Sequence, residues 1–219
     1  MGHSRSDRCS LTKTIPAAFD PESQETLRRQ AKAELRKRLN SLRRALPLQS
    51  VADRSQRIVA RLLEHPYLLD ARSVALFSAM PEKREVDLSE LHRLLSARGL
   101  RIYYPFMDRT PEGYRTGFRL LRPGDVLAKQ TQRFSEPNPS APVAMRGDLD
   151  LVVVPALGIT LHGHRLGFGA GFYDSTLPDF CPPAKSICVG YDFQRVIELP
   201  VEAHDVACDA LVTDAHEPP

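Results

Sequence analysis

The sequence contains no tryptophan, only four cysteines and no apolar stretch long enough to cross a membrane among its 219 residues. Its longest apolar run, 151–157, falls far short of the about 20 residues that a transmembrane helix needs. The four cysteines form no Cys-x-x-Cys pair and have no histidine at zinc-finger spacing, which argues against a structural zinc site. The N-terminus lacks the apolar core of a signal peptide. We therefore expect a cytoplasmic protein with reduced thiols and no membrane partner.

Excess charge is also small, because 30 lysines and arginines oppose 27 aspartates and glutamates and leave a net charge of +3. The positive charge is concentrated in one segment, 22–46. A nucleic-acid-binding helix of this kind would carry aromatic residues between its cations for base stacking, and 28–44 contains none. The composition therefore argues against an RNA-binding module, and we expect no nucleic-acid partner.

Two helices are predicted after a polar segment, 1–21, that we expect to be a flexible tail. From Gln24 onward, apolar residues recur at spacings of three and four and predict an amphipathic helix that ends before Pro47. Ser50 is placed to cap a second helix. The predicted apolar face of the first helix comprises Leu27, Ala31, Leu35, Leu39, Leu42 and Leu46, and that of the second comprises Val51, Ile58, Val59, Leu62 and Leu63.

Beyond the helices, apolar runs alternate with helical patterns. Strands are predicted at 73–80 and 100–105, with a helix at 88–97 between them, which is typical of a right-handed crossover in a parallel sheet. The segment 107–144 is rich in proline, glycine and polar residues and predicts long loops or a hairpin, with one strand at 117–121.

Further strands are predicted at 149–157, 186–191 and 210–213. The run 149–157 is almost continuously apolar, as expected of a strand covered by helices on both faces. We therefore expect one domain, 22–219, that is a three-layer α/β/α structure with a mostly parallel sheet and an N-terminal helical arm.

The segment 165–174 carries the strongest signal for chemistry. Gly167, Gly169 and Gly171 occupy every second position, which allows backbone N–H groups to turn toward one anion. A helix after Gly171 would add its N-terminal dipole. Arg165 supplies a forked cation and Asp174 a hard oxygen ligand suited to magnesium. The spacing matches neither the dinucleotide-binding nor the phosphate-loop pattern, so a phosphate cradle and a tightly packed turn both fit.

Together with other segments of the sequence, this loop resembles the corresponding segments of the 5-formyltetrahydrofolate cyclo-ligase family. The matching segments occur in the family's order from Ala31 to Thr213. In the amino-terminal and middle parts they are Lys32-Ala-Glu-Leu-Arg36, Glu85-Val86-Asp87 and Ser135-Glu136-Pro137. In the carboxy-terminal half they are 149–157, 165–174, Val189-Gly190-Tyr191, Glu198-Leu199-Pro200-Val201-Glu202-Ala203-His204-Asp205 and Asp209.

The resemblance implies a sheet like that of the NagB/RpiA/CoA-transferase-like fold and an ATP- and magnesium-dependent ligase. Such an enzyme closes 5-formyltetrahydrofolate to 5,10-methenyltetrahydrofolate and releases ADP and phosphate, and we expect it to act as a monomer. The family pattern implies catalytic roles for Arg165 and Asp174, and folate contacts for Glu85, Phe168 and Phe172. It implies magnesium binding by Asp174 and Asp209, and ATP binding by Lys32, Arg36, Arg165, Gly167, Gly169, Gly171 and Tyr173.

The sequence departs from the family pattern at the folate side. Phe172 stands where the family usually has tyrosine, and the tryptophan common in the middle segment is absent. The aromatic residues that remain as candidates for a pterin wall are Tyr103, Tyr104, Phe106, Tyr114 and Phe118. A relative that binds folate or nucleotide without turnover is an alternative, as is a phosphosugar isomerase that needs no ATP. Because the cations and carboxylates of the family pattern are all present, the enzyme is the favoured interpretation.

Overall fold

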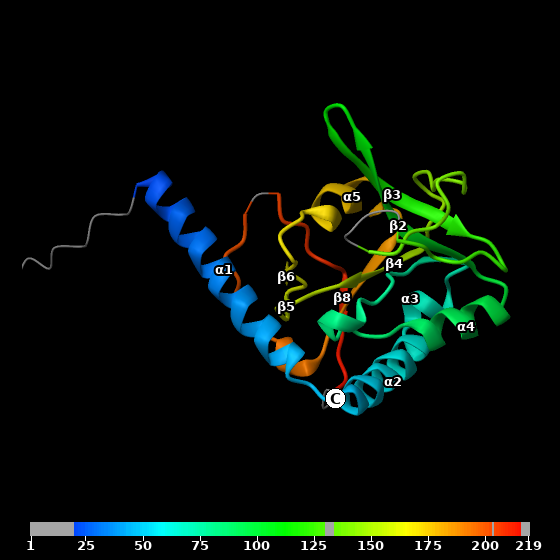
Figure 1. Cartoon of the computed structure of the whole chain (residues 1–219), viewed down its shortest axis with the longest axis horizontal. Helices are drawn as coiled ribbons and strands as arrows, with labels where there is room; N and C mark the ends of the chain where they lie inside the picture. The colour runs from blue at the N-terminus through cyan, green and yellow to red at the C-terminus, as the bar shows by residue number, and fades with distance from the viewer. Residues whose placement is uncertain (1–19, 130–133, 203, 216–219) are drawn as a thin grey trace, which may run out of the picture.

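A six-stranded sheet forms the centre of the protein, for which the computed structural model describes residues 20–129, 134–202 and 204–215. The strand order is β3-β2-β1-β4-β7-β8, and every neighbouring pair is parallel except β2 and β3 (Figure 1). The predicted mostly parallel sheet is therefore confirmed. The strands are β1 (Ser73–Ala75), β2 (Arg101–Thr110), β3 (Gly113–Leu121), β4 (Leu151–Pro155), β7 (Lys185–Val189) and β8 (Ala210–Val212).

Five α-helices accompany the sheet in the described residues. They are α1 (Pro21–Arg44), α2 (Leu48–Glu64), α3 (Pro66–Leu69), α4 (Ser89–Ala97) and α5 (Phe172–Phe180). The smaller elements are the 3₁₀ helices η1 (Pro81–Lys83) and η2 (Asp192–Gln194) and the short pair β5 (Gly158–Ile159) and β6 (Arg165–Leu166). Within the ranges that the structure covers, no helix has the length and apolarity needed to span a bilayer.

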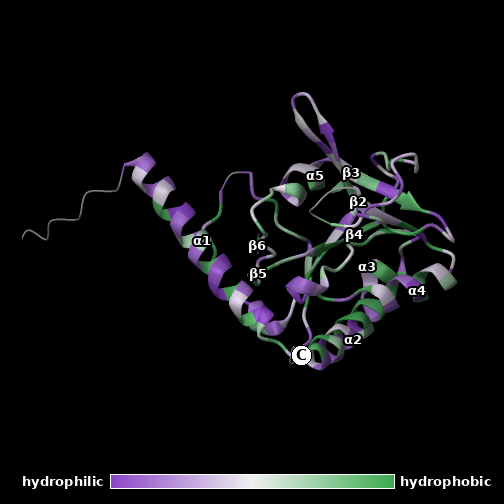
Figure 2. Cartoon of the chain, in the orientation of Figure 1, coloured by the Kyte–Doolittle hydropathy of each residue, from purple (hydrophilic) through white to green (hydrophobic). Residues whose placement is uncertain are grey.

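Helices cover both faces of the sheet. Side chains alternate along each strand, so Val153 on β4 faces one core while its neighbour Val152 faces the other. The first core is closed by α2 and α4, through Ile58 and Leu91 among others, and the second by α5 through Leu177. The hydropathy colouring shows the apolar strands running through the interior (Figure 2). Burial on both faces is why 149–157 is almost continuously apolar.

The order in which the chain adds strands to the sheet reverses between β1 and β4. From β1 the chain crosses through α4 to β2 and then turns back as β3, whereas β4, β7 and β8 build outward on the other side. In open α/β sheets the crevice at the carboxyl ends of the strands beside such a switch point is where ligands bind. The topology therefore points to the ends of β1 and β4.

Several predicted boundaries are wrong. The strand predicted at 73–80 ends at Ala75, because the chain leaves the sheet there toward η1. The first part of the region 107–144, predicted as loops or a hairpin, is a hairpin, in which β2 and β3 pair from Ile102 with Leu121 to Thr110 with Gly113. The described residues from 122 to 144 belong to no named helix or strand. Helix α2 begins at Leu48 directly after Pro47 and has no side-chain cap, so Ser50 does not cap it.

The burial of α1 differs most from the prediction. Leu27 and Leu42, expected on its apolar face, are 48% and 47% exposed, whereas Lys32 and Arg43 are only 9% and 2% exposed. Leu39 is the fully buried leucine of this helix and packs with Leu157 and Leu166. Figure 2 shows how little of α1 is hydrophobic. The helix therefore presents cations to the rest of the molecule. Of the expected tail, 1–21, residues 1–19 lie outside the described residues, and Asp20 and Pro21 are the N-cap and the first residue of α1.

Candidate active site

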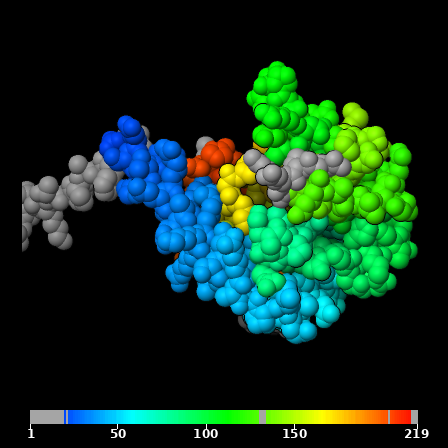
Figure 3. Space-filling view, viewed as in Figure 1, coloured from blue at the N-terminus to red at the C-terminus, as the bar shows by residue number. Residues whose placement is uncertain are grey.

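A cavity of about 460 Å³ lies at the switch point of the sheet. Phe77 and Ser78, which follow β1, line it together with Pro155 at the end of β4. The segment around η1 and the loop 167–171 also line it, and Lys83 of η1 meets the loop at the ring of Phe168. Figure 3 shows this glycine loop, in yellow, between α1, in blue, and the green-cyan segment that follows β1. The predicted phosphate cradle thus lies where the topology places a ligand site.

The glycine loop has the backbone conformation that its sequence predicts. Gly169 and Gly171 have φ angles of +94° and +68°, which other residues adopt only with strain. Gly171 is also the N-cap residue of α5, so the predicted helix after it is confirmed. Gly167, Gly169, Ala170 and Gly171 all line the cavity. Their backbone and the N-terminus of α5 together suit an anion.

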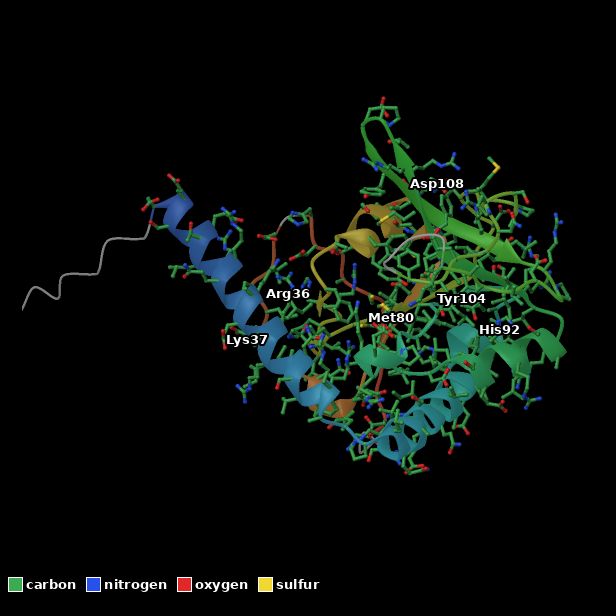
Figure 4. All side chains as sticks on the ribbon, viewed as in Figure 1. Arg36, Lys37, Met80, His92, Tyr104 and Asp108 are labelled. Atoms are coloured by element: carbon green, nitrogen blue, oxygen red, sulfur yellow. The ribbon has the colours of Figure 1, made fainter. Side chains whose placement is uncertain are left out.

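Arg36 ties α1 to this loop. Its Nε donates a hydrogen bond to the carbonyl oxygen of Gly167 at 2.9 Å, and its guanidinium lies against Gly169. Figure 4 shows Arg36 pointing from α1 toward the loop, whereas Lys37 points away from it. Arg36 therefore supports the loop from behind and is not itself among the residues that line the cavity.

Lys32, one turn before Arg36, is engaged elsewhere. Its Nζ lies 2.7 Å from a carboxylate oxygen of Glu202 and 2.9 Å from one of Asp205. Burial opposes the charge of Lys32, but these two carboxylates outweigh it and raise its pKa. Lys32 does not line the cavity, so the structure does not bring it to the loop that would hold phosphate.

Arg165 and Asp174 form an ion pair on the loop side of the cavity, in which the arginine side chain is buried and the carboxylate is partly exposed. Nη2 of Arg165 lies 2.7 Å from Oδ1 of Asp174, and Nη1 donates to the carbonyl of Val206. The amide of Val206 donates to the same Asp174 oxygen at 3.3 Å. The side chain of Arg165 is 3% exposed and that of Asp174 is 29% exposed. Both line the cavity, and Arg165 holds Asp174 in place while leaving its Oδ2 available to a metal ion.

Asp209, the second expected magnesium ligand, is not brought to this cavity. Its Oδ1 lies 3.0 Å from Nζ of Lys185, and its Oδ2 accepts from the amide and hydroxyl of Ser186 at 2.9 and 2.8 Å. Burial opposes its ionisation, but these bonds lower the pKa of Asp209. The geometry gives Asp209 a structural role at the start of β7. Among the described residues, three side chains have possible metal-ligand atoms within 4.8 Å of one another, and they are Glu202, His204 and Asp205. They lie beside Lys32 and do not include Asp209.

Glu85 also lines the cavity and is 4% exposed. Its Oε2 accepts a hydrogen bond from the amide of Met80 at 2.9 Å, and Nη2 of Arg43 lies 4.0 Å from its Oε1. Burial raises the pKa of Glu85, and the Met80 amide and the charge of Arg43 counteract that rise only in part. Arg43 is not among the site residues that the family pattern implies. Its spacing of seven from Arg36, which places both on one helical face, is the signal that points to it.

Two expected folate contacts, Phe168 and Phe172, line the cavity together with Tyr173. Phe168 is 36% exposed and lies between two cations, with Cζ of Arg43 at 4.9 Å and Nζ of Lys83 at 4.4 Å from its ring centre. Phe172 is buried and contacts Phe134 edge to face, and Phe134 and Phe77 complete the aromatic wall. The aromatic residues proposed from the sequence do not line this cavity. Tyr103, Phe106 and Phe118 lie in the core, Tyr114 is exposed, and Tyr104 lines a neighbouring cavity.

Comparisons with known proteins show the family. The family model of the 5-formyltetrahydrofolate cyclo-ligases matches residues 28–214. A 5-formyltetrahydrofolate cyclo-ligase of Escherichia coli is 32% identical over 174 residues, which cover 78% of this chain and 93% of that protein. Another from Mycolicibacterium smegmatis is 40% identical over 92 residues, a match that covers 42% of this chain and 47% of that relative.

A solved structure has the same architecture. The NMR structure of Aquifex aeolicus 5,10-methenyltetrahydrofolate synthetase superposes with a TM-score of 0.69 at 28% identity and covers 84% of this chain and 90% of that one. Because the family model spans most of the sequence, the resemblance seen in the motifs is confirmed. This chain belongs to the 5-formyltetrahydrofolate cyclo-ligase family.

Proposed function

We propose that this protein cyclises 5-formyltetrahydrofolate to 5,10-methenyltetrahydrofolate and cleaves ATP to ADP and phosphate as it does so. The observation that carries the proposal is one cavity with two unlike walls. The loop wall consists of the backbone N–H groups of 167–171 with Arg165 and Asp174. The folate wall consists of Glu85 and the aromatic rings, of which Phe168 and Phe172 project from the loop and from the start of α5. Those walls suit a polyphosphate and a pterin respectively.

The reaction needs the formyl oxygen to become a leaving group. If that oxygen attacks the γ-phosphorus, ADP departs, and the amine N10 then attacks the formyl carbon. Phosphate leaves with the former formyl oxygen, N10 loses its proton, and the ring closes. Catalysis of such a transfer is mostly positioning and neutralisation of charge.

The glycine loop would hold the transferring phosphate through its backbone. Gly167, Gly169 and Gly171 place no Cβ between their N–H groups and the cavity, and α5 directs its N-terminal dipole to the same place. Arg36 fixes the loop through Gly167. Arg165 fixes Asp174 and adds positive charge behind the phosphates. Tyr173 packs beside Arg165, with its ring centre 5.9 Å from the guanidinium carbon.

Asp174 fits the role of a magnesium ligand. Its carboxylate is partly exposed, lines the cavity and uses Oδ1 for its bonds to Arg165 and Val206. A hard oxygen beside a phosphate-binding loop is the donor that magnesium prefers. When bound there, magnesium would reduce the negative charge of the triphosphate. Asp209 has both oxygens engaged by Ser186 and Lys185, so we assign the metal to Asp174 alone.

Glu85 and the aromatic wall would bind the folate. A buried carboxylate can accept hydrogen bonds from the N–H groups of a pterin, while Phe168 and Phe172 exclude water from the reacting atoms. Exclusion of water matters because a phosphorylated formyl group would otherwise hydrolyse. We also propose that the protein acts as a monomer in the cytoplasm, and that its sheet shares the three-layer NagB/RpiA/CoA-transferase-like arrangement.

The test is to supply 5-formyltetrahydrofolate, ATP and magnesium together and then to omit each in turn. We expect methenyl product, followed by its near-ultraviolet absorbance, only when all three are present. Binding of folate or nucleotide without product would favour the relative that has lost turnover. Conversion of a phosphosugar without ATP would favour the isomerase.

A further inference from the structure

Arg43 is the most deeply buried cation whose role the proposed reaction leaves open. It lies in the last turn of α1 and is 2% exposed. In the part of the chain that the structure describes, its Nε and Nη2 have no hydrogen-bond partner. A buried guanidinium with unpaired donors destabilises the fold, so packing alone does not account for an arginine at this position.

The neighbours of Arg43 belong to the folate side of the cavity. Its Nη2 lies 4.0 Å from Oε1 of Glu85, and its Cζ lies 4.9 Å from the ring centre of Phe168. The Glu85 distance is short enough for a strong charge interaction and too long for a hydrogen bond. Both neighbours line the cavity, and each is therefore held from behind by the same side chain.

We propose that Arg43 is a positioning residue that keeps Glu85 ionised when the cavity holds folate and that fixes the ring of Phe168 at the folate side. This inference rests on the proposed function. A ligand that fills the cavity removes water from Glu85 and so favours its protonated form. Arginine suits the task because a guanidinium stays charged when buried, whereas a lysine loses its proton more readily.

Other charges face Glu85, and Arg43 is the one best shielded from solvent. Lys83 on η1 also favours the carboxylate, and Glu82 opposes it, but Lys83 is half-buried and Glu82 is exposed. Tyr173 and Tyr191 lie close enough to interact with Glu85 and are neutral, because burial raises the pKa of both hydroxyls. Arg44 interacts with Arg43 and is itself exposed. Removal of Arg43 therefore removes the least screened positive charge.

The experiment measures kcat/KM for 5-formyltetrahydrofolate against pH in Arg43→Met, with Arg44→Met as the matched control. Protonation of Glu85 weakens folate binding at low pH, and loss of Arg43 raises the pKa of Glu85. We expect the acidic limb of the Arg43→Met profile to move up by about 1 pH unit, since an opposite charge at this distance shifts a carboxyl pKa by about 1 to 3 units. The KM for ATP should change less than about twofold, because Arg43 meets the glycine loop at the ring of Phe168, whereas Arg36 and the loop backbone support the proposed phosphate site.

Two further variants complete the test. Arg43→Lys keeps the charge, and its acidic limb should return toward that of the wild type. Glu85→Gln has no carboxyl to titrate, and addition of Arg43→Met to it should not move the limb. If Arg43→Met does not fold, Arg43→Gln takes its place, because it is also neutral but keeps hydrogen-bonding capacity.

An Arg43→Met or Arg43→Gln enzyme whose acidic limb coincides with that of Arg44→Met would overturn the assignment. So would a shift of equal size in the Glu85→Gln background. Failure of the wild type to form product is a separate result, which would reject the proposed function and not the role of Arg43 alone.

Discussion

On the loop wall of the cavity, Arg165 lies 2.7 Å from Asp174 and Arg36 lies 2.9 Å from the Gly167 carbonyl, whereas on the folate wall Arg43 stays 4.0 Å from Glu85. The first wall is held by short, directional hydrogen bonds. The second is held by a charge interaction between buried groups, one of which has unpaired donors. The first arrangement gives a fixed cradle, and the second makes the ionisation of Glu85 depend on the Met80 amide and on the charges of Arg43 and Lys83.

This difference suggests a division of labour between the walls. A phosphate cradle works best when its donors are preorganised, because they need not rearrange during transfer. A folate wall that depends on an ionised carboxyl works over the pH range that its counter-charge sets. Substitutions on the loop wall should therefore change turnover or ATP binding, and those on the other wall should change the pH dependence of folate binding.

The largest effect is expected from Asp174→Asn. The amide keeps the size of the side chain but removes the charge that faces both Arg165 and the proposed magnesium, so kcat should fall by at least about 100-fold. Asp179→Asn, an exposed position on the same helix, is the matched control. Circular dichroism should show both variants folded, and a folded Asp174→Asn enzyme with full activity would remove Asp174 from the mechanism.

A smaller effect is expected from Gly169→Ala. The added Cβ meets only ordinary contacts with Arg36, so the cost comes from the φ of +94° and should be about 1 to 3 kcal/mol of stability. Because the loop must then move, the KM for ATP should rise about tenfold. Gly124→Ala has a similar φ of +88° at a turn away from the cavity. It should lose similar stability in thermal unfolding and keep its KM, and equal kinetic effects in the two variants would contradict the cradle.

The smallest kinetic effect is expected from Asp209→Asn. Its carboxylate bonds to Ser186 and Lys185 at the start of β7, so the variant should lose about 1 kcal/mol of unfolding free energy. Turnover and the magnesium concentration for half-maximal rate should stay within about twofold of the wild type. A large rise in that magnesium concentration would restore Asp209 as a metal ligand, as first expected from the sequence.

The sequence allowed the sheet and the glycine loop to be predicted because their signals are local. Continuous apolar runs indicate buried strands, and glycines at every second position indicate a strained turn. The burial of α1 was not predictable in this way. Its leucine periodicity suggests an apolar face, but its buried face carries Lys32, Arg36 and Arg43, whose partners lie far away in sequence. The partners of Lys32 and Arg36 are 170 and 131 residues away.

The prediction of which aromatic residues line the folate side was wrong for the same reason. Tyr103, Phe106 and Phe118 are aromatic residues of the β2–β3 hairpin, and their side chains face the cores. The rings that line the cavity come from the glycine loop, from α5 and from the segments after β1 and before β4. Only the three-dimensional arrangement shows which of these aromatic residues meet. The cavity therefore has an aromatic wall although the sequence contains no tryptophan, because Phe168, Phe172 and their neighbours form it.

The most direct test of the coupling between the two walls follows one oxygen atom. The substrate is 5-formyltetrahydrofolate with ¹⁸O in the formyl group, incubated with the wild-type protein, ATP and magnesium, and the released phosphate is analysed by mass spectrometry. If the formyl oxygen is phosphorylated before N10 closes the ring, the label appears in phosphate, one atom for each methenyl product formed. Product accompanied by unlabelled phosphate, with the ¹⁸O in water, would contradict the account.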